Sequence, residues 1–265
     1  MSCLDRYLAG NREALTVIRV PTEEEERTRS DSRQRAQLLA ERKRLVAQRL
    51  SAVRYYGHDL PDEWWRPKAF ELLRHERPDF LLAVLERWQR VLVVVHAELE
   101  ALTRQVESAQ TQELPTGLGA LTAQVLDREI RDWHRFQNRR QVASYTGLVP
   151  GEDSSGERRW RGSITKHGNP RVRHILVEAC WRLPVFQPDY KAYQQRRAAL
   201  TTAKARGNKA MRKKLLVGLA RQFAVDWWRI RTGRTTPEKL GLQMSWPAAY
   251  VLRGKAPGVT APAAA

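Results

Sequence analysis

Apolar side chains recur between residues 81 and 102 at alternating steps of four and three: Leu81, Leu85, Trp88, Leu92, Val95, Leu99 and Leu102. This spacing is the a/d seam of a coiled coil over three heptads. An earlier, strongly charged segment carries a second apolar stripe: Leu38, Leu45, Val46, Leu50 and Val53. We therefore predict two long helices within residues 22–112, joined by a turn region near 57–78 as an antiparallel coiled-coil hairpin. An ordinary helical bundle is the alternative.

Pro115 ends this pattern, and shorter helices are predicted after it, at 120–131, 136–146, 169–183 and 207–232. A polar, Gly-rich loop separates the second from the third, with a small β element around 158–165. The predicted fold class is mainly α, with a compact helical domain after the hairpin. The predicted divisions are a linker remnant at 1–21, the hairpin at 22–112, the compact domain at 114–200, a basic C-terminal helix at 201–240 and a disordered Ala/Pro/Gly-rich tail at 241–265.

The balance of charged residues indicates what kind of molecule the chain binds. Lys and Arg number 47 against 29 Asp and Glu, a formal net charge of +18. Residues 131–234 hold 24 of these cations and only seven acids, so nearly all the excess lies there. This favours an anionic partner: nucleic acid first, then a membrane surface or an acidic protein.

Other features of the sequence bear on the compartment. Two cysteines are too few for a disulfide framework and suit a reducing cytosol. The N-terminus lacks the layout of a signal peptide, and no apolar run is long enough to span a membrane. We expect a cytoplasmic, nucleoid-associated protein without a membrane partner.

Gly117 and Gly119 precede a predicted helix. Two glycines at such a position let backbone N–H groups approach a phosphate, as in the hairpin of helix-hairpin-helix DNA-binding proteins. A helix-hairpin-helix-like start with phosphate contact is one interpretation; a plain helical corner is the other.

The loop at 147–179 carries the candidate chemistry. A serine that attacks phosphorus must be exposed, must have cations near the phosphoryl oxygens and needs a proton acceptor. The loop supplies the first two conditions with Ser154, Ser155, Arg158, Arg159, Arg161, Lys166, His167, Asn169, Arg171 and Arg173. Asn169 and Pro170 also suit the start of a helix, which adds an anion site. Residue types alone favour the alternative, a basic loop that holds phosphates while its serines only donate hydrogen bonds. We predict no metal ligands here.

The order of the motifs in this region resembles the C-terminal transposase domain of the insertion-sequence 110 family. The pieces are the helix from Phe136 to Tyr145, GLVP at 147–150, SSG at 154–156, ITKHGN at 164–169 and the Arg-rich helix that follows; YLAG at 7–10 and the charged helices resemble the family's linker. The resemblance implies recombinases that use a structured guide RNA and a serine nucleophile on a DNA phosphate. It assigns that role to Ser155, with Ser154 as the rival.

The resemblance also implies a RuvC-like N-terminal domain whose acids bind Mg²⁺, and no segment of that kind precedes the predicted hairpin. We expect this chain to lack that domain and to bind no cofactor itself. The expected partners are DNA, a guide RNA, and further copies of the chain, as a dimer or tetramer through the coiled coil. The functional hypothesis is transposition by serine-mediated strand exchange. The alternatives are a non-catalytic nucleic-acid-binding relic and an assembly module.

Overall fold

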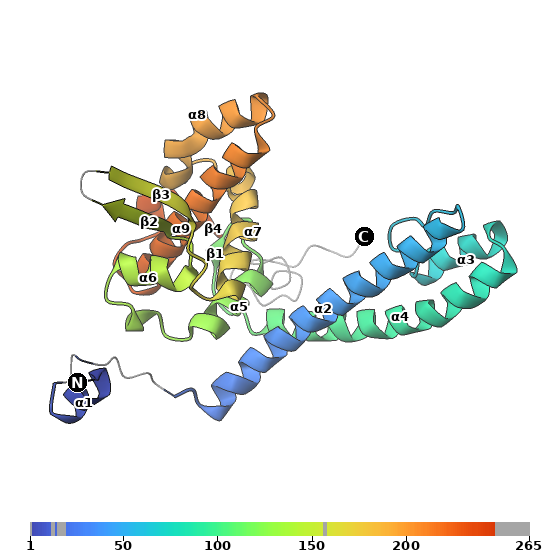
Figure 1. Ribbon diagram of the computed structural model, residues 1–265, viewed down its shortest axis with the longest axis horizontal. Coiled ribbons are helices and arrows are strands. Elements are labelled where there is room, and N and C mark those ends of the chain that lie inside the picture. Colours follow the sequence, from blue (N-terminus) through green and yellow to red (C-terminus); the bar gives the residue numbers. More distant parts are fainter. Residues whose placement is uncertain (1, 12–13, 15–19, 156–157, 247–265) are drawn as a thin grey trace.

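The structure is a computed structural model that describes residues 2–11, 14, 20–155 and 158–246, with the side chains of 153–161 left out. A long helical hairpin extends from a compact helical domain (Figure 1). The mainly α fold class predicted from the sequence is confirmed, because the described strands are short and form two small antiparallel sheets.

The hairpin consists of helices α2 (Glu23–Tyr55) and α4 (Asp79–Ser108), after a short helix α1 (Cys3–Leu8). Thr22 caps α2, since its hydroxyl accepts the Glu25 N–H while the Glu25 carboxylate accepts the Thr22 N–H. Contacts across the pair run in opposite senses along the two helices: Gln105 to Asp31, His96 to Arg42 and Trp88 to Arg49. The predicted antiparallel hairpin is therefore present; its supercoiling stays a prediction.

The predicted seam of α4 is buried to different depths. Leu81, Leu85, Leu92 and Leu99 are buried, whereas Trp88, Val95 and Leu102 are only partly covered. The predicted turn region contains a further helix, α3 (Pro67–Glu76). Its Phe70 and Leu73 close the distal end of the hairpin over Trp64 and Trp65, in a cluster that gives this half of the molecule its own core.

The compact domain begins with strand β1 and the helix that follows the two glycines. Its described elements are β1 (Leu114–Pro115), α5 (Ala120–Ile130), η2 (Trp133–Arg135), α6 (Arg139–Thr146), β2 (Pro150–Ser155), β3 (Arg158–Ile164), α7 (Pro170–Phe186), α8 (Lys191–Ala205), α9 (Lys209–Arg231), η3 (Glu238–Leu240) and β4 (Met244–Ser245). The helices predicted at 120–131, 136–146, 169–183 and 207–232 correspond to α5, α6, α7 and α9. Helix α8 lies in a stretch for which the sequence pattern predicted no helix.

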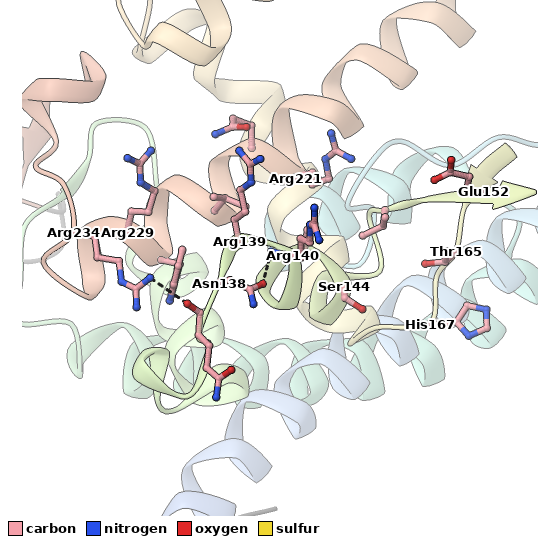
Figure 2. Close-up of a pocket in the computed structure, with 16 residues that line it drawn as sticks. Asn138, Arg139, Arg140, Ser144, Glu152, Thr165, His167, Arg221, Arg229 and Arg234 are labelled. Carbon is pink, nitrogen blue, oxygen red and sulfur yellow. Dashed lines mark hydrogen bonds between the residues drawn. The ribbon is translucent and has the colours of Figure 1, made fainter. Parts of the chain in front are cut away.

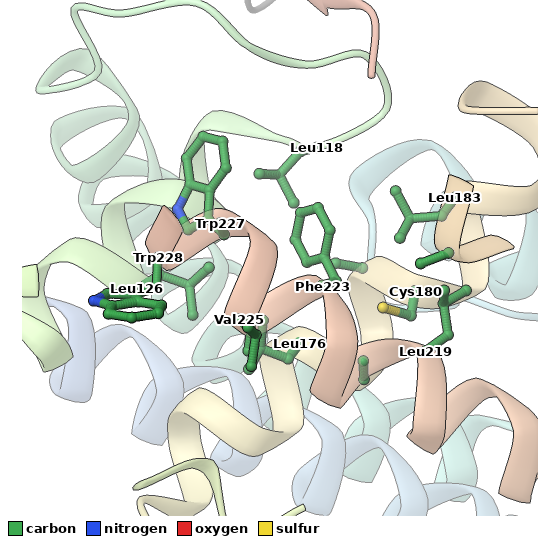
Figure 3. Close-up of a cluster of buried hydrophobic side chains, with 14 of the residues drawn as sticks. Leu118, Leu126, Leu176, Cys180, Leu183, Leu219, Phe223, Val225, Trp227 and Trp228 are labelled. Atoms are coloured by element: carbon green, nitrogen blue, oxygen red, sulfur yellow. The ribbon is translucent and has the colours of Figure 1, made fainter. Parts of the chain in front are cut away.

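Helix α9 runs through the centre of this domain and carries much of its core (Figure 3). Leu219 and Phe223 are fully buried, and the Trp228 Nε1–H donates to the Trp133 carbonyl oxygen over 3.1 Å. The core thus extends across residue 200, where the sequence analysis placed a boundary. Met244 and Leu114 belong to strands that pair antiparallel, so the predicted disordered tail begins with an ordered strand; residues 247–265 lie outside the described part of the chain.

Candidate nucleic-acid interface

Strands β2 and β3 form an antiparallel hairpin that projects from the compact domain (Figure 1). The β element predicted around 158–165 is confirmed, and the residues before it, predicted as loop, form its partner strand. In the register Ser154 pairs with Arg159 and Ser155 with Arg158. The side chains of the candidates Ser154, Ser155, Arg158, Arg159 and Arg161 lie outside the described part. The backbone nevertheless places both serines beside the tip of the hairpin.

Two glycines fix the base of this hairpin. Gly147 ends α6 with φ of 64°, in the left-handed region that favours glycine. A Cβ at Gly168 would overlap the carbonyl oxygen of Tyr145 and the backbone nitrogen of Gly147. This close approach lets the Asn169 N–H donate to the Tyr145 carbonyl over 2.7 Å and the Lys166 N–H to the Gly147 carbonyl over 3.1 Å. The GLVP motif (147–150) and the last four residues of the ITKHGN motif, here called the KHGN motif (166–169), are therefore held together by backbone contact.

Asn169 has a structural role at this junction. Its Oδ1 accepts the N–H groups of Arg171 and Val172 at the start of α7, and its Nδ2 donates to the Glu129 carboxylate over 2.9 Å and to the Tyr145 hydroxyl over 3.2 Å. The helix cap predicted for Asn169 is confirmed. These four bonds engage the side-chain oxygen and both amide hydrogens of Asn169, so neither hydrogen is free to donate to nucleic acid as the sequence predicted.

Glu129 of α5 connects this junction to the helical hairpin. Its carboxylate is buried and also accepts from Arg33 of α2 over 3.2 Å, with Arg171 at 3.9 Å. Burial alone raises the pKa of Glu129. Hydrogen bonds from Arg33 and Asn169, with the positive charges of Arg33 and Arg171, outweigh burial and lower the pKa below its usual value.

Further bonds hold α5 against α2. Arg128 donates to the Thr28 carbonyl oxygen over 2.8 Å, and Arg131 pairs with Glu25 at 3.1 Å. Together with the Arg33–Glu129 pair, they span about two turns of α2. The helical hairpin is therefore attached to the helix that also braces the KHGN motif.

The other predicted residues of this motif divide into two groups. Arg173 is half-buried, and its guanidinium donates to the carbonyl oxygens of Thr146 and Lys166, so it fixes the loop. Lys166, His167 and Arg171 are exposed. These three keep side chains at the surface where a phosphate can reach them.

The two glycines predicted to approach a phosphate lie elsewhere. Strand β1, and no helix, directly precedes them, so the helix-hairpin-helix-like start is not formed. A Cβ at Gly117 would stand 2.5 Å from the Cβ of Phe186, at the end of α7 opposite to Asn169. The 17 residues of α7 separate these ends by about 24 Å. Gly117 permits close packing, while Gly119 is exposed at the start of α5.

An open groove of about 1500 Å³ lies between α6, α9 and the base of the β2–β3 hairpin (Figure 2). Of the side chains that the structure describes, five arginines line it, and Glu152 is the only acid among them. The charged and polar lining residues include Arg139, Arg140, Ser144, Glu152, Thr165, His167, Arg221, Arg229 and Arg234. Among the sequence candidates whose side chains are described, the groove contains only His167.

The arginines of the groove differ in how far they are engaged. Arg229 lies 3.6 Å from Asp226, and Arg234 stacks over Trp228 and donates to the Gln137 carbonyl. Within the described part of the chain, Arg139, Arg140 and Arg221 have no ion-pair partner. Closely placed, uncompensated guanidinium groups attract phosphates and present forks that match their oxygens.

The described residues contain no cluster of three or more His, Cys, Asp or Glu that could hold a metal ion. Cys180 is buried, which raises the pKa of its thiol, and Cys3 is exposed. No helix among the described residues is both long and apolar enough to cross a membrane.

Several known proteins are similar to this chain in sequence. A profile of the Transposase IS116/IS110/IS902 family matches residues 112–195, which include the groove's α6 wall and the whole β2–β3 hairpin. Two proteins of Sinorhizobium fredii named as transposases are similar: y4qE is 32% identical over 174 residues, 63% of this chain and 43% of that protein, and y4rJ is 30% identical over 257 residues, 84% and 62%. The transposase for insertion sequence element IS1328 of Yersinia enterocolitica is 24% identical over 193 residues, 69% and 58%.

The chain thus spans between about two fifths and three fifths of the length of these relatives. The matched family region coincides with the motifs that form the hairpin and its base. Residues 112–195 of this chain therefore form a domain of the IS116/IS110/IS902 family of transposases.

Proposed function

We propose that this chain acts in DNA transposition by holding the DNA backbone in the arginine groove and presenting Ser155 of the adjacent hairpin to a DNA phosphate. The observation that carries the proposal is the position of the groove. Glu152 lies in the groove wall and on the same strand as Ser155, three residues away. At about 3.3 Å per residue, the Ser155 backbone lies about 10 Å along β2 from the groove lining.

The proposed reaction is a transesterification. The serine Oγ forms a bond to phosphorus as the bond from phosphorus to a deoxyribose oxygen breaks, the serine proton passes to a base, and the leaving oxygen takes up a proton. The number of phosphodiester-type bonds is conserved, so a second deoxyribose hydroxyl can reverse the step on another strand. Negative charge builds on the phosphoryl oxygens during both steps, and nearby guanidinium groups stabilise it.

The groove itself supplies the affinity for DNA in this proposal. Each phosphate neutralised releases counterions, and the logarithm of the binding constant falls with the logarithm of salt concentration by about 0.9 per phosphate contact. Engagement of all five groove arginines would give a slope of about −4 to −5. Such contacts place the duplex without reading its sequence.

In this proposal, a guide RNA selects the DNA sequence, and further copies of the chain complete the assembly. The family resemblance supports a structured guide RNA, and RNA phosphates are recognised by the same guanidinium groups. It also supports several copies of the chain acting together, joined through the helical hairpin. The Mg²⁺ implied by the family has no ligand cluster among the described residues, and no step of the proposed reaction runs through it.

A second function, nucleic-acid binding without strand cleavage, is favoured by one observation. The groove residues Arg139, Arg140 and Arg221 come from outside the SSG stretch, so binding does not depend on either serine. Both functions predict binding, and only the first predicts a covalent adduct.

Binding is tested with Arg140→Ala and Arg221→Ala, which remove guanidinium groups from opposite walls of the groove. Lys43→Ala is the matched control, because Lys43 is an exposed cation of α2 remote from the groove. Fluorescence anisotropy with a labelled 30-base-pair duplex, repeated over a salt series, gives the dissociation constant and the slope. We expect each groove variant to weaken binding several-fold near 0.1 M salt and to lower the slope by about 1. Groove variants that behave like Lys43→Ala would place the DNA on another surface.

A further inference from the structure

A buried carboxylate lies directly behind the wall that α9 contributes to the groove. The Asp226 side chain is only 4% exposed, and it follows Gln222 by four residues and precedes Arg229 by three on the same face of the helix. Both Gln222 and Arg229 line the groove, where Figure 2 labels Arg229. Asp226 is not one of the lining residues, so DNA held in the groove does not touch it.

The two oxygens of this carboxylate contact different parts of the domain. Oδ1 accepts a hydrogen bond from Nε2 of Gln222 over 3.1 Å and lies 3.6 Å from Nη1 of Arg229. Oδ2 accepts the hydroxyl of Tyr190 over 2.7 Å. Burial, and then the charge of Asp226, raise the pKa of the Tyr190 hydroxyl above its ordinary value, so this group keeps the proton that it donates. One oxygen therefore contacts two groove residues, while the other is bound to the core.

Tyr190, at the start of α8, is a well-fixed partner for the second oxygen. Its side chain is fully buried, and its ring packs edge-on against Phe223 with the centroids 6.2 Å apart. Its carbonyl oxygen accepts the Tyr193 N–H over 2.9 Å. The preceding residue is confined as well, because a Cβ at Gly241 would overlap the carbonyl oxygen of Asp189. The link between α7 and α8 thus holds the Tyr190 hydroxyl in one place.

The arrangement gives Arg229 a fixed position before DNA arrives. A long side chain that is already held loses less conformational freedom when it binds a phosphate. A guanidinium group carries five N–H donors in a rigid fork, so a carboxylate beside Nη1 leaves other donors for the phosphate oxygens. Gln222 contacts the same carboxylate oxygen, so one carboxylate orients two residues of the groove wall.

We propose that Asp226 is a positioning residue, which holds Arg229 and Gln222 in the orientation that meets a DNA phosphate. Tyr190 anchors it to the core. This role rests on the proposed function and deepens it, because it makes the geometry of the phosphate site depend on a residue that DNA does not reach. An acid behind a phosphate site weakens the attraction for anions, so any gain in affinity from Asp226 comes from orientation.

The test is a double-mutant cycle on DNA binding by the whole chain, with Tyr190→Phe and Arg229→Ala. Tyr190→Phe removes the hydroxyl that fixes Oδ2, but it keeps the aromatic ring and changes no charge. We expect it to weaken binding of a labelled duplex about threefold near 0.1 M salt, measured by fluorescence anisotropy. In the Arg229→Ala background, the same substitution should change the dissociation constant by less than about 1.5-fold, because the arginine that it positions is gone.

Two further variants separate orientation from stability and from charge. Leu183→Ala opens a cavity in the same core without removing a polar contact of Asp226, and should leave the dissociation constant within about 1.5-fold of the parent. Asp226→Asn keeps the shape of the side chain and adds one positive charge behind the groove wall. We expect it nevertheless to weaken binding about threefold, and only when Arg229 is present. Circular dichroism checks that each variant keeps its helix content.

Three results would overturn the role of Asp226. Tyr190→Phe could leave binding unchanged, or it could weaken binding equally with and without Arg229, which would make its effect one of the fold alone. Leu183→Ala could weaken binding as much as Tyr190→Phe does, with the same meaning. Asp226→Asn could tighten binding in both backgrounds, which would show that the carboxylate acts only as a charge.

The arginine variants distinguish failure of this role from failure of the proposed function. If Arg229→Ala binds DNA like the parent while Arg140→Ala and Arg221→Ala bind weakly, the groove remains the DNA site and the role of Asp226 fails. If all three arginine variants bind like the parent, the groove itself is not the DNA site.

Discussion

Removal of the Glu129 carboxylate is the sharpest test of how the KHGN motif is held. Glu129→Ala takes away the acceptor of a 2.9 Å hydrogen bond from Asn169 and of the 3.2 Å pair with Arg33. A hydrogen bond to a buried charge contributes about 1.5–3 kcal/mol. The Arg33 side chain is 37% exposed, so its pair is discounted to about 1 kcal/mol or less. We expect the free energy of unfolding to fall by roughly 2–4 kcal/mol.

The measurement is urea unfolding followed by tryptophan fluorescence, since Trp133 is buried in the same core as α5. Glu178→Ala is the matched control, because Glu178 is an exposed acid on α7, and a loss of about 0.5 kcal/mol or less is expected there. Glu129→Gln keeps an acceptor for Asn169 but not the charge, and should fall between the two. A loss for Glu129→Ala no larger than that of the control would refute the view that this carboxylate braces the motif.

Two further predictions concern the same junction. Arg33 and Asn169 lower the pKa of Glu129 below its unfolded value of about 4.3, so the stabilisation by this carboxylate is present above about pH 4.3 and is lost as the pH falls through the folded pKa. In unfolding curves at stepped pH, the difference in stability between the parent and Glu129→Gln should therefore narrow at low pH. A difference that does not change with pH would contradict the assignment. Gly168→Ala should cost at least about 2 kcal/mol because the new Cβ meets the backbone, whereas Gly119→Ala, with open space around it, should cost about 1 kcal/mol or less by the same unfolding measurement.

Much of the helical architecture follows from the sequence pattern. The heptad spacing that begins at Leu81 predicts α4, and the Thr22 cap with the acids after it predicts the start of α2. These are local signals, carried by residues within one or two turns. Helix α8 lacks them, because it buries only Ala192, Leu200 and Ala203 and so shows no apolar periodicity.

The site depends on contacts that the sequence pattern does not reveal. Strand β2 is polar and holds glycine and serines, which have low strand propensity; its pairing is set by the contact of Gly147 with Gly168 at the base. The groove joins residues about 80 positions apart, on α6 and α9. Its α9 wall was recoverable in part, since Arg221, Val225 and Arg229 recur at steps of four in the half of the helix that also carries the buried Leu219 and Phe223.

The motif order indicated the family and one region of interest, but residue types alone did not show which side chains also hold the loop. Asn169 and Arg173 have the chemistry of phosphate ligands, yet both direct their polar groups at backbone and at buried partners. Polar side chains next to a close glycine contact hold the loop in place through hydrogen bonds, which leaves fewer of their polar groups for a ligand.

The most direct test of the proposed reaction is a covalent adduct between this protein and DNA. The chain, with a RuvC-like domain of the family and cognate guide RNA supplied, is mixed with end-labelled cognate DNA and resolved on a denaturing gel. We expect a labelled band at the mass of protein plus DNA, its loss in Ser155→Ala, and its retention in Ser154→Ala and in Ser163→Ala, an exposed serine of the same hairpin. An adduct that survives Ser155→Ala, or none from the parent chain when DNA binding is intact, would contradict the role proposed for Ser155.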